Sequence, residues 1–212
     1  LSYMITMLGI PFGNAELEAK NDNGEMRISL SVKSNAFLGS VFPVNNFIET
    51  RLLAGNFVIT KVKQLEGNFR SDIGFTIFLQ DKSVFWIDRI RNRYSRETIP
   101  NSEVLDTLSG FYLLRNKELQ VGRTEHLHIY DGDAYTPVTI EVLRHEMIRL
   151  PNMTKMDTLV VRPVRENGAT FRKSGDILIW ITNDEKKVPV KFETSLPIGS
   201  VTAELVSAES KP

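Results

Sequence analysis

The sequence contains no cysteine, which removes disulfide bonds, thiolate nucleophiles and cysteine-ligated zinc together. It also has no excess charge of either sign, since 26 basic residues balance 26 acidic ones. A balanced chain lacks the basic field that attracts nucleic acid, so no nucleic-acid partner is expected. Its longest apolar runs, such as "ILIWI" at 177–181, fall short of the ~20 residues of a membrane-spanning helix.

Several motifs of catalysis are missing as well. The sequence has no glycine-rich phosphate loop, no "GxSxG" elbow and no "HExxH" pair. We therefore expect no cofactor, and the sequence favours a protein that is not an enzyme. Three histidines leave a Ser/His/Asp triad open on composition alone.

The most frequent pattern in the sequence is the alternation of apolar and polar residues. In 3–8, 15–20 and 26–33 every second residue is apolar, and glycine-containing turns separate these segments. This pattern is typical of an antiparallel meander with one buried face and one solvent-exposed face. Apolar residues at helical spacing in 36–42 predict a short helix before Pro43.

Further strand signals follow along the rest of the chain. They cover residues 57–65, 68–79, 83–94, 124–131, 136–144, 157–165, 169–184, 187–195 and 200–208, with a turn expected at Asn167 and Gly168. The sequence thus predicts a mainly β fold in which residues 1–212 form one domain. We expect a strongly curved antiparallel sheet or partly open barrel with one or two short helices packed on it.

The segment "DTLSGFYLLR" (106–115) interrupts the strands. Its apolar spacing predicts a helix over 103–114, with Ser102 or Asn101 as the cap. Asp106 then lies near the positive end of the helix and Arg115 near its negative end. The helix either completes the core by packing on the sheet or lines and lids a pocket for an apolar ligand. The second alternative makes ligand-binding candidates of Asp106, Phe111, Tyr112 and Arg115.

A basic segment, "DRIRNRYSR" (88–96), is a second candidate site. As a strand it places Arg89, Arg91 and Arg93 on one face, where guanidinium groups suit a phosphate or an anionic lipid head group. The alternative is a solvated face or a charged edge that resists aggregation. Arg89 and Arg91 are the binding candidates from this segment.

The pair His126 and His128 is the strongest metal-like signal. If Gly132 and Asp133 form a two-residue loop, the register places Thr139 opposite His126, and Glu141 shares a face with both histidines. The opposite face carries Leu127, Ile129, Val138, Ile140 and Val142. Because that clean apolar face is explained by burial alone, we expect the histidines to face water without a metal.

Ordered anchors along the chain resemble a known family. "YMITMLGIPFGNAEL" near the start, "DTLSGFYLLR", and "IWITNDEKKVPVKFE" followed by "IGSVTAEL" are similar to segments of the bacterial domain of unknown function 3108 family. The resemblance implies an exported, periplasmic or cell-envelope β protein without established activity, and it transfers no catalytic residue. By analogy, it suggests the incompletely closed sheet of lipoprotein-carrier proteins.

Three functions are consistent with these observations. The first is a carrier or scaffold for an apolar, lipidic or peptidic partner, and the second is a metal-dependent hydrolase built on His126, His128 and Glu141. The third is a purely structural envelope protein without a ligand pocket. Because the chain begins at Leu1, we also expect either a processed form or a shortened chain, from which any signal peptide has already been removed.

Overall fold

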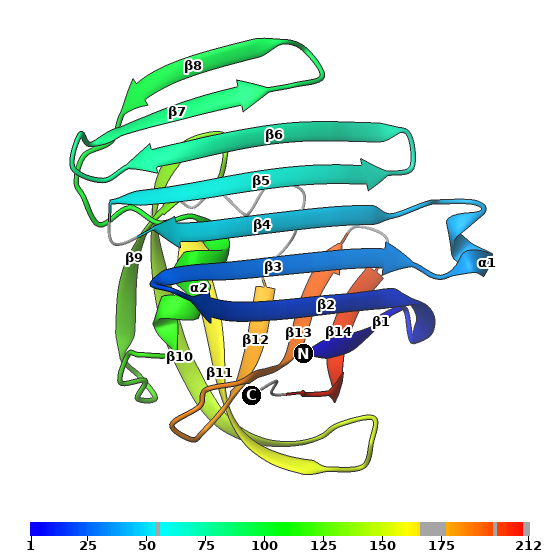
Figure 1. Ribbon diagram of the computed structural model, residues 1–212. Coiled ribbons are helices and arrows are strands. Elements are labelled where there is room, and N and C mark those ends of the chain that lie inside the picture. The colour runs from blue at the N-terminus through cyan, green and yellow to red at the C-terminus, as the bar shows by residue number, and fades with distance from the viewer. Residues whose placement is uncertain (54–55, 166–176, 197–198, 210–212) are drawn as a thin grey trace. The chain divides into compact units, whose positions relative to one another are not determined.

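The computed structural model describes residues 1–53, 56–165, 177–196 and 199–209 (Figure 1). These residues form a fourteen-stranded antiparallel sheet in the order β8-β7-β6-β5-β4-β3-β2-β1-β14-β13-β12-β11-β10-β9. The strands are β1 (Ser2–Met7), β2 (Ile10–Asp22), β3 (Glu25–Ser34), β4 (Asn45–Leu53), β5 (Phe57–Glu66), β6 (Phe69–Phe78), β7 (Ser83–Asp88), β8 (Arg93–Thr98), β9 (Thr124–Tyr130), β10 (Tyr135–Arg149), β11 (Lys155–Arg165), β12 (Ile177–Thr182), β13 (Pro189–Leu196) and β14 (Gly199–Ser207). The helices are α1 (Ala36–Gly39) and α2 (Thr107–Leu114).

The predicted fold class is confirmed. The sheet is antiparallel, the helices are short, and within the described ranges the sheet is not closed, with β8 and β9 at its two ends. Neither of the helices described is long and apolar enough to cross a membrane.

The chain divides into two compact units, which are considered separately. Unit 1 comprises residues 1–15, 113–127 and 137–212, and unit 2 comprises residues 16–112 and 128–136. Strand β2 begins in unit 1 and ends in unit 2. The expectation of a single domain stays a prediction.

In unit 2 the alternating pattern places one apolar face of the sheet inside. Ile28 of β3 pairs with Thr50 of β4, Thr50 pairs with Thr60 of β5, and Thr60 pairs with Phe75 of β6, so these side chains share the inner face. The core of this unit consists of Val58, Phe75, Ile77, Val84, Ile99, Val104 and Tyr130. The rings of Phe75 and Tyr130 meet edge to face with their centroids 5.1 Å apart.

In unit 1 the central strands are buried on both faces. Consecutive residues of β11 (159–161) and of β12 (179–181) are all buried, which explains the continuous apolar run in this part of the sequence. At β1 the hydroxyl of Tyr3 donates to the carbonyl of Pro189, 2.8 Å away, so the phenol enters the core with its polar atom satisfied.

The hairpin of β9 and β10 has the predicted loop. The amide of Asp131 donates to the carbonyl of Ala134, and Gly132 adopts a positive φ of 94°. Thr139 lies within hydrogen-bonding distance of His126, as the register requires. The side chains of Leu127, Ile129, Val138 and Ile140 are buried, His126 is exposed and His128 is half-buried.

Three local predictions differ from the structure. The strand expected over 83–94 is interrupted by a turn at 89–92, and the helix expected over 103–114 begins only at Thr107. The turn expected between 3–8 and 15–20 is shorter than predicted, because β2 already begins at Ile10 and includes Pro11. The one-turn helix before Pro43 is confirmed as α1. The turn expected at Asn167 and Gly168 lies outside the described residues.

Helix α2 offers a direct test of core packing. Leu108 is 9% exposed, whereas Leu113 of the same helix is 38% exposed. We expect Leu108→Ala to lower the free energy of unfolding by about 2–5 kcal/mol, because it leaves a cavity. Chemical denaturation measures this loss, with Leu113→Ala as the matched control. Equal effects of the two substitutions would contradict the packing of Leu108.

Candidate functional site

Asp106, a binding candidate from the sequence, is positioned by the residue before it. The amide of Leu105 donates to the carbonyl of His128 at 2.9 Å, and the amide of Tyr130 donates to the carbonyl of Leu105 at 2.8 Å. Leu105 thus forms a parallel bridge to Ile129 at the free edge of β9. This bridge fixes the backbone one residue before Asp106 and two residues before α2 begins at Thr107.

The carboxylate of Asp106 caps helix α2. Its Oδ1 accepts the amide of Leu108 at 2.9 Å and that of Ser109 at 3.5 Å, and its carbonyl accepts the amide of Gly110 at 2.9 Å. The predicted caps, Asn101 and Ser102, are wrong. Asn101 instead accepts the amide of Glu103 in the turn that precedes the helix.

A chain of hydroxyl groups links this cap to the sheet. Thr50 of β4 donates its hydroxyl to Asp106 Oδ1 at 2.7 Å, so its hydroxyl oxygen is left to accept from Thr60 of β5 at 3.3 Å. On the helix, Ser109 donates its hydroxyl to Asp106 Oδ2. We call Asp106, Thr50, Thr60 and Ser109 the Asp106 cluster. None of the four is more than 2% exposed.

Burial governs the electrostatics of the cluster. Desolvation raises the pKa of the Asp106 carboxyl above its ordinary value of 3.8, while hydrogen bonds from Ser109, Thr50 and the amides of Leu108 and Ser109 oppose the rise. The acid remains satisfied when it is protonated, because a neutral carboxyl can donate to the Ser109 hydroxyl oxygen. Since Asp106 is sealed from solvent, the geometry suits a fastening between helix and sheet better than acid–base chemistry on a diffusing substrate.

The two threonines of the cluster were missed in the sequence. The sequence does contain a signal for them. Thr50 and Thr60 stand at alternating positions of β4 and β5 that mostly carry apolar residues, and a hydroxyl group buried there needs a hydrogen-bond partner. Thr60 contacts Thr50 on the neighbouring strand, but the acceptor for Thr50, Asp106, is 56 residues away in the chain, so the local pattern does not identify it.

The other candidates on this segment lie at and beyond the middle of α2. Phe111 and Tyr112 are half-buried. Arg115 follows the last residue of α2 and donates Nε to the carbonyl of Lys186 at 2.8 Å. Ligand binding by Asp106, Phe111, Tyr112 and Arg115 stays a prediction.

The basic strand face expected from Arg89, Arg91 and Arg93 is absent from the described residues, because 89–92 form a turn. Asp88 accepts the amides of Ile90 and Arg91 at 2.9 and 3.0 Å, and Arg91 Nη1 donates to its Oδ2 at 2.8 Å. These contacts hold the pKa of Asp88 below its ordinary value. Arg89 pairs instead with Asp72 at 3.0 Å, so the guanidinium groups of Arg89 and Arg91 are each held by an acid.

The histidine candidates have separate partners. His126 lies 3.2 Å from the hydroxyl of Thr139, and Nδ1 of His128 lies 2.8 Å from the hydroxyl of Tyr135. Glu141 accepts Nη2 of Arg162 at 2.7 Å and Nε at 2.9 Å. Across the described ranges, no three histidine or acidic side chains gather as a metal site.

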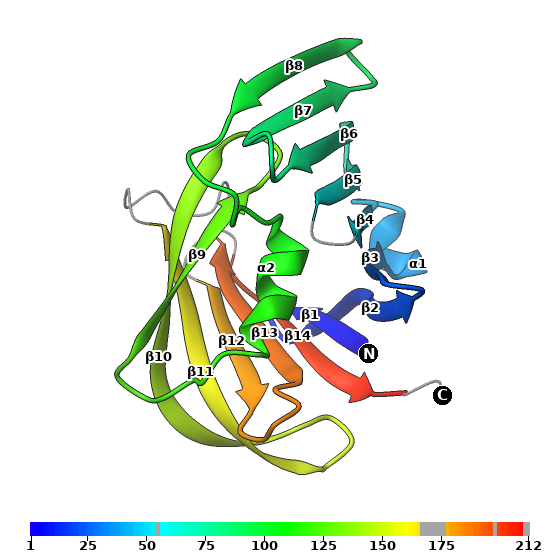
Figure 2. The same cartoon turned by 60° about the vertical axis from the view of Figure 1, so that its left-hand side comes forward.

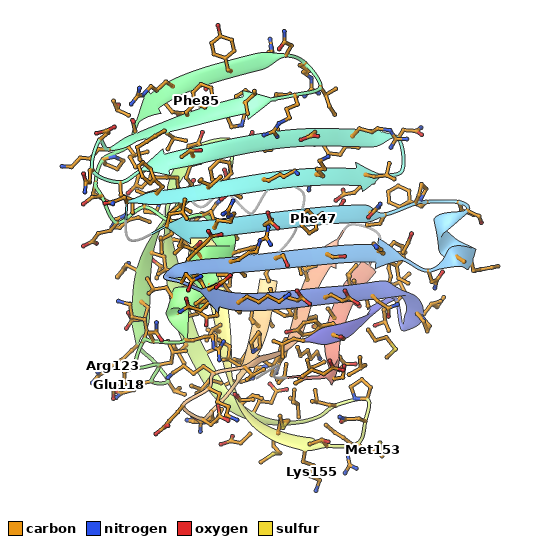
Figure 3. All side chains as sticks on the ribbon, viewed as in Figure 1. Phe47, Phe85, Glu118, Arg123, Met153 and Lys155 are labelled. Carbon is orange, nitrogen blue, oxygen red and sulfur yellow. The ribbon has the colours of Figure 1, made fainter. Side chains whose placement is uncertain are left out.

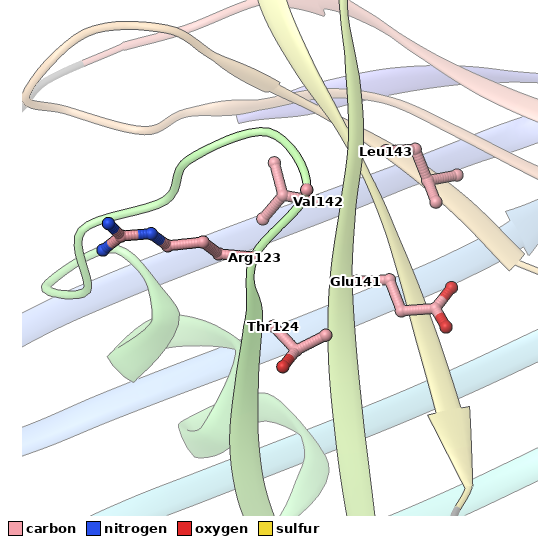
Figure 4. Close-up of a pocket in the computed structure, with 6 residues that line it drawn as sticks. Arg123, Thr124, Glu141, Val142 and Leu143 are labelled. Atoms are coloured by element: carbon pink, nitrogen blue, oxygen red, sulfur yellow. The ribbon is translucent and has the colours of Figure 1, made fainter.

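A shallow pocket of about 290 Å³ opens in unit 1, where β9 starts beside β10 (Figure 4). Its lining consists of Gly122, Arg123, Thr124, Glu141, Val142 and Leu143. The acid in this lining already pairs with Arg162, and the volume lies at the lower end of the ~300–1,000 Å³ typical of small-molecule sites. The pocket therefore offers little room for an acyl chain.

The outer face of unit 2 carries a second feature that the sequence analysis missed. Phe57 of β5 meets Phe78 of β6 at 5.6 Å between centroids, and the Arg96 guanidinium of β8 lies 5.5 Å from the Phe78 ring centre. Arg96 pairs across the strands with Phe85 of β7, whose ring lies 6.4 Å from that of Tyr94. These four rings and Arg96 form what we call the aromatic face, and Figure 3 marks Phe85 within it.

Within the aromatic face the rings are accessible. Tyr94 is 74% exposed, Phe57 is 40% exposed and Phe85 is 38% exposed. Exposed apolar patches on a protein surface are candidates for interaction sites, and the aromatic face is a patch of this kind.

The Asp106 cluster generates a pH prediction with a defined sign. Because the carboxyl has a raised pKa in the folded state, its contribution to stability is full below pH 3.8 and is lost as the pH rises through the folded-state pKa. We expect the free energy of unfolding of the wild type, relative to Asp106→Asn, to fall across this range by at most about 1.4 kcal/mol per pH unit. Denaturant titrations at several pH values measure the difference.

Two variants separate charge from hydrogen bonding. Asparagine keeps an acceptor for the cap and for Thr50, whereas Asp106→Ala leaves buried groups unsatisfied and should cost about 2–4 kcal/mol. A wild-type profile parallel to that of Asp106→Asn would refute the raised pKa.

Comparisons with known proteins give the chain its family. A crystal structure from Brucella abortus, described as a beta-barrel-like protein of domain of unknown function DUF1849, is similar with a TM-score of 0.65. The match has 11% sequence identity and covers 97% of this chain and 94% of that one, so it shows the fold alone. None of the curated proteins compared with the chain matches it. The family model for "protein of unknown function (DUF3108)" matches residues 2–206, and the chain therefore belongs to that family.

Proposed function

We propose that this protein is an exported protein of the cell envelope that binds an anionic amphiphile, without catalysing a reaction on it. The observation that carries the proposal is the aromatic face of unit 2. Rings that line an exposed sheet surface suit apolar chains, and a guanidinium among them suits a phosphate or carboxylate. The partner is thus lipidic, with an acyl chain and a charged head group.

The geometry of Arg96 supports an anionic rather than a neutral partner. Its ion pair with Asp81 is long, at 3.7 Å, and both side chains are more than 60% exposed. Such a surface pair contributes little, so a ligand anion competes with it at small cost. The contact with Ser83 at 3.1 Å orients the guanidinium across β7.

A scaffold is better supported than a carrier that encloses its ligand. The Asp106 cluster fastens α2 to β4 and β5 through buried hydrogen bonds, which favours a fixed helix over a lid that moves with the ligand. Recognition by a strand edge is less favoured, because β8 presents Arg93, Arg96 and Glu97 along the sheet edge and charges there oppose pairing with another strand.

Binding of 8-anilinonaphthalene-1-sulfonate, an apolar anion, tests the aromatic face. We expect the wild type to bind the dye saturably, with an increase in dye fluorescence. The affinity for the dye should be about ten-fold lower in the double variant Phe85→Ser with Tyr94→Ser, since two exposed rings are removed. Ile90→Ser is the matched control, because Ile90 is 54% exposed and lies in the turn between the same strands. Unchanged affinity in the double variant would rule out this face.

The compartment and the cargo are tested separately. Fractionation of cells that express the full-length protein should place it in the envelope fraction. Mass spectrometry of an organic extract of the purified protein should detect less than one acyl lipid per chain if the protein is an open scaffold. One tightly retained lipid per chain would instead establish an enclosing carrier.

A further inference from the structure

A second apolar surface lies at the other end of the strands of unit 2. Helix α1 and the residues after it form this end together with the turn between β5 and β6, where the amide of Gly67 donates to the carbonyl of Pro43 at 2.8 Å. Strand β5 spans ten residues from Phe57 in the aromatic face to Glu66 at this turn, so the two surfaces lie roughly 30 Å apart. We call Phe37, Val41, Phe42 and Phe69 the apolar tip.

The apolar tip is unusually exposed. Phe37 is 84% exposed and Val41 is 83% exposed, while Phe42 and Phe69 are 50% and 41% exposed. In Figure 1, α1 projects beyond the ends of β3 and β4. Exposure of large apolar side chains to water is unfavourable, so their burial against a partner stabilises the complex.

The backbone holds the tip in place. Ser34 accepts the amide of Val44 on Oγ at 3.0 Å and donates its own amide to the carbonyl of Val44 at 3.0 Å, which closes the loop around α1. The ring of Phe42 packs over Gly67, where a Cβ atom would lie 2.7 Å from the ring. The exposed side chains are therefore presented on a closed loop anchored to the sheet.

Charge around the tip favours one kind of partner. Residues 34–48, "SNAFLGSVFPVNNFI", contain no charged side chain, although a quarter of the whole chain is charged. The exposed cations Lys33 and Arg70 flank the tip in sequence. Of the nearby acids, Asp72 pairs with the cations Lys63 and Arg89, while Glu66 accepts Nδ2 of the neutral Asn46 side chain at 2.7 Å.

We propose that the apolar tip docks unit 2 on the surface of an anionic phospholipid bilayer. Phe37 and Val41 enter the boundary between head groups and acyl chains, where apolar side chains partition favourably. Lys33 and Arg70 meet the negative surface potential of the lipid head groups. This surface shares no residue with the aromatic face, so it goes beyond the binding of a single amphiphile proposed above.

Sedimentation of the full chain with vesicles tests this docking. The wild type should bind vesicles of phosphatidylcholine mixed with phosphatidylglycerol, and it should bind pure phosphatidylcholine vesicles more weakly. The double variant Phe37→Ser with Val41→Ser should lower the partition coefficient by about ten-fold or more. The fold should survive, because both side chains are almost fully exposed. Circular dichroism verifies this.

Three controls make the result specific. Met147→Ser removes a side chain that is 65% exposed elsewhere, in β10, and should leave vesicle binding unchanged. Lys33→Gln with Arg70→Gln should weaken binding to anionic vesicles, and high salt should do the same. Phe85→Ser with Tyr94→Ser should retain vesicle binding, so failure of the aromatic face and failure of the tip are distinguishable.

Several results would overturn the docking. These are absence of binding to either vesicle type, equal binding to both, or unchanged binding of the Phe37→Ser, Val41→Ser variant. A concentration-dependent dimer that this variant abolishes, without vesicle binding by the wild type, would assign the surface to a second copy of the chain.

Discussion

The buried carboxyl of Asp106 is the constraint on which the arrangement of unit 2 depends. A carboxyl group that leaves water loses solvation, and only a complete set of hydrogen-bond partners offsets that loss. Here the partners come from the helix backbone, from Ser109 on the helix and from Thr50 on β4. One side chain therefore sets where α2 begins and which strand it packs on. Thr60 extends the same network to β5.

The surfaces of unit 2 that we propose for binding lie outside its buried core. The inner face is filled by the apolar core, whereas the outer face carries the aromatic rings with Arg96 and the strand ends carry the apolar tip. Both surfaces expose large apolar side chains beside cations. The same chemistry suits lipids in two forms, a single amphiphile at the aromatic face and a bilayer at the tip.

The sequence predicted the features that depend on local periodicity. Alternation identified which face of β3 is apolar and the register of the β9–β10 hairpin. Helical spacing identified α1 and α2. The cap of α2 was misplaced because Asn101 and Ser102 also look like caps. The choice of Asp106 depends on Leu105 bridging to β9 and on Thr50, both distant in sequence. The arginine segment was misassigned because its alternation resembles a strand, while Asp88 and the positive φ of Asn92 close a turn. The aromatic face depends on which strands are neighbours, and local pattern does not supply that information.

Hydrogen exchange of the backbone amides of α2 tests most directly whether this helix is fixed or mobile. If the Asp106 cluster fastens the helix, the amides of Leu108, Ser109 and Gly110 should exchange as slowly as those of β4 and β5, because all open together in global unfolding. Fast exchange of these helix amides, while β4 and β5 stay protected, would show a helix that opens by itself. That result would contradict the account and would make α2 the lid of a ligand site.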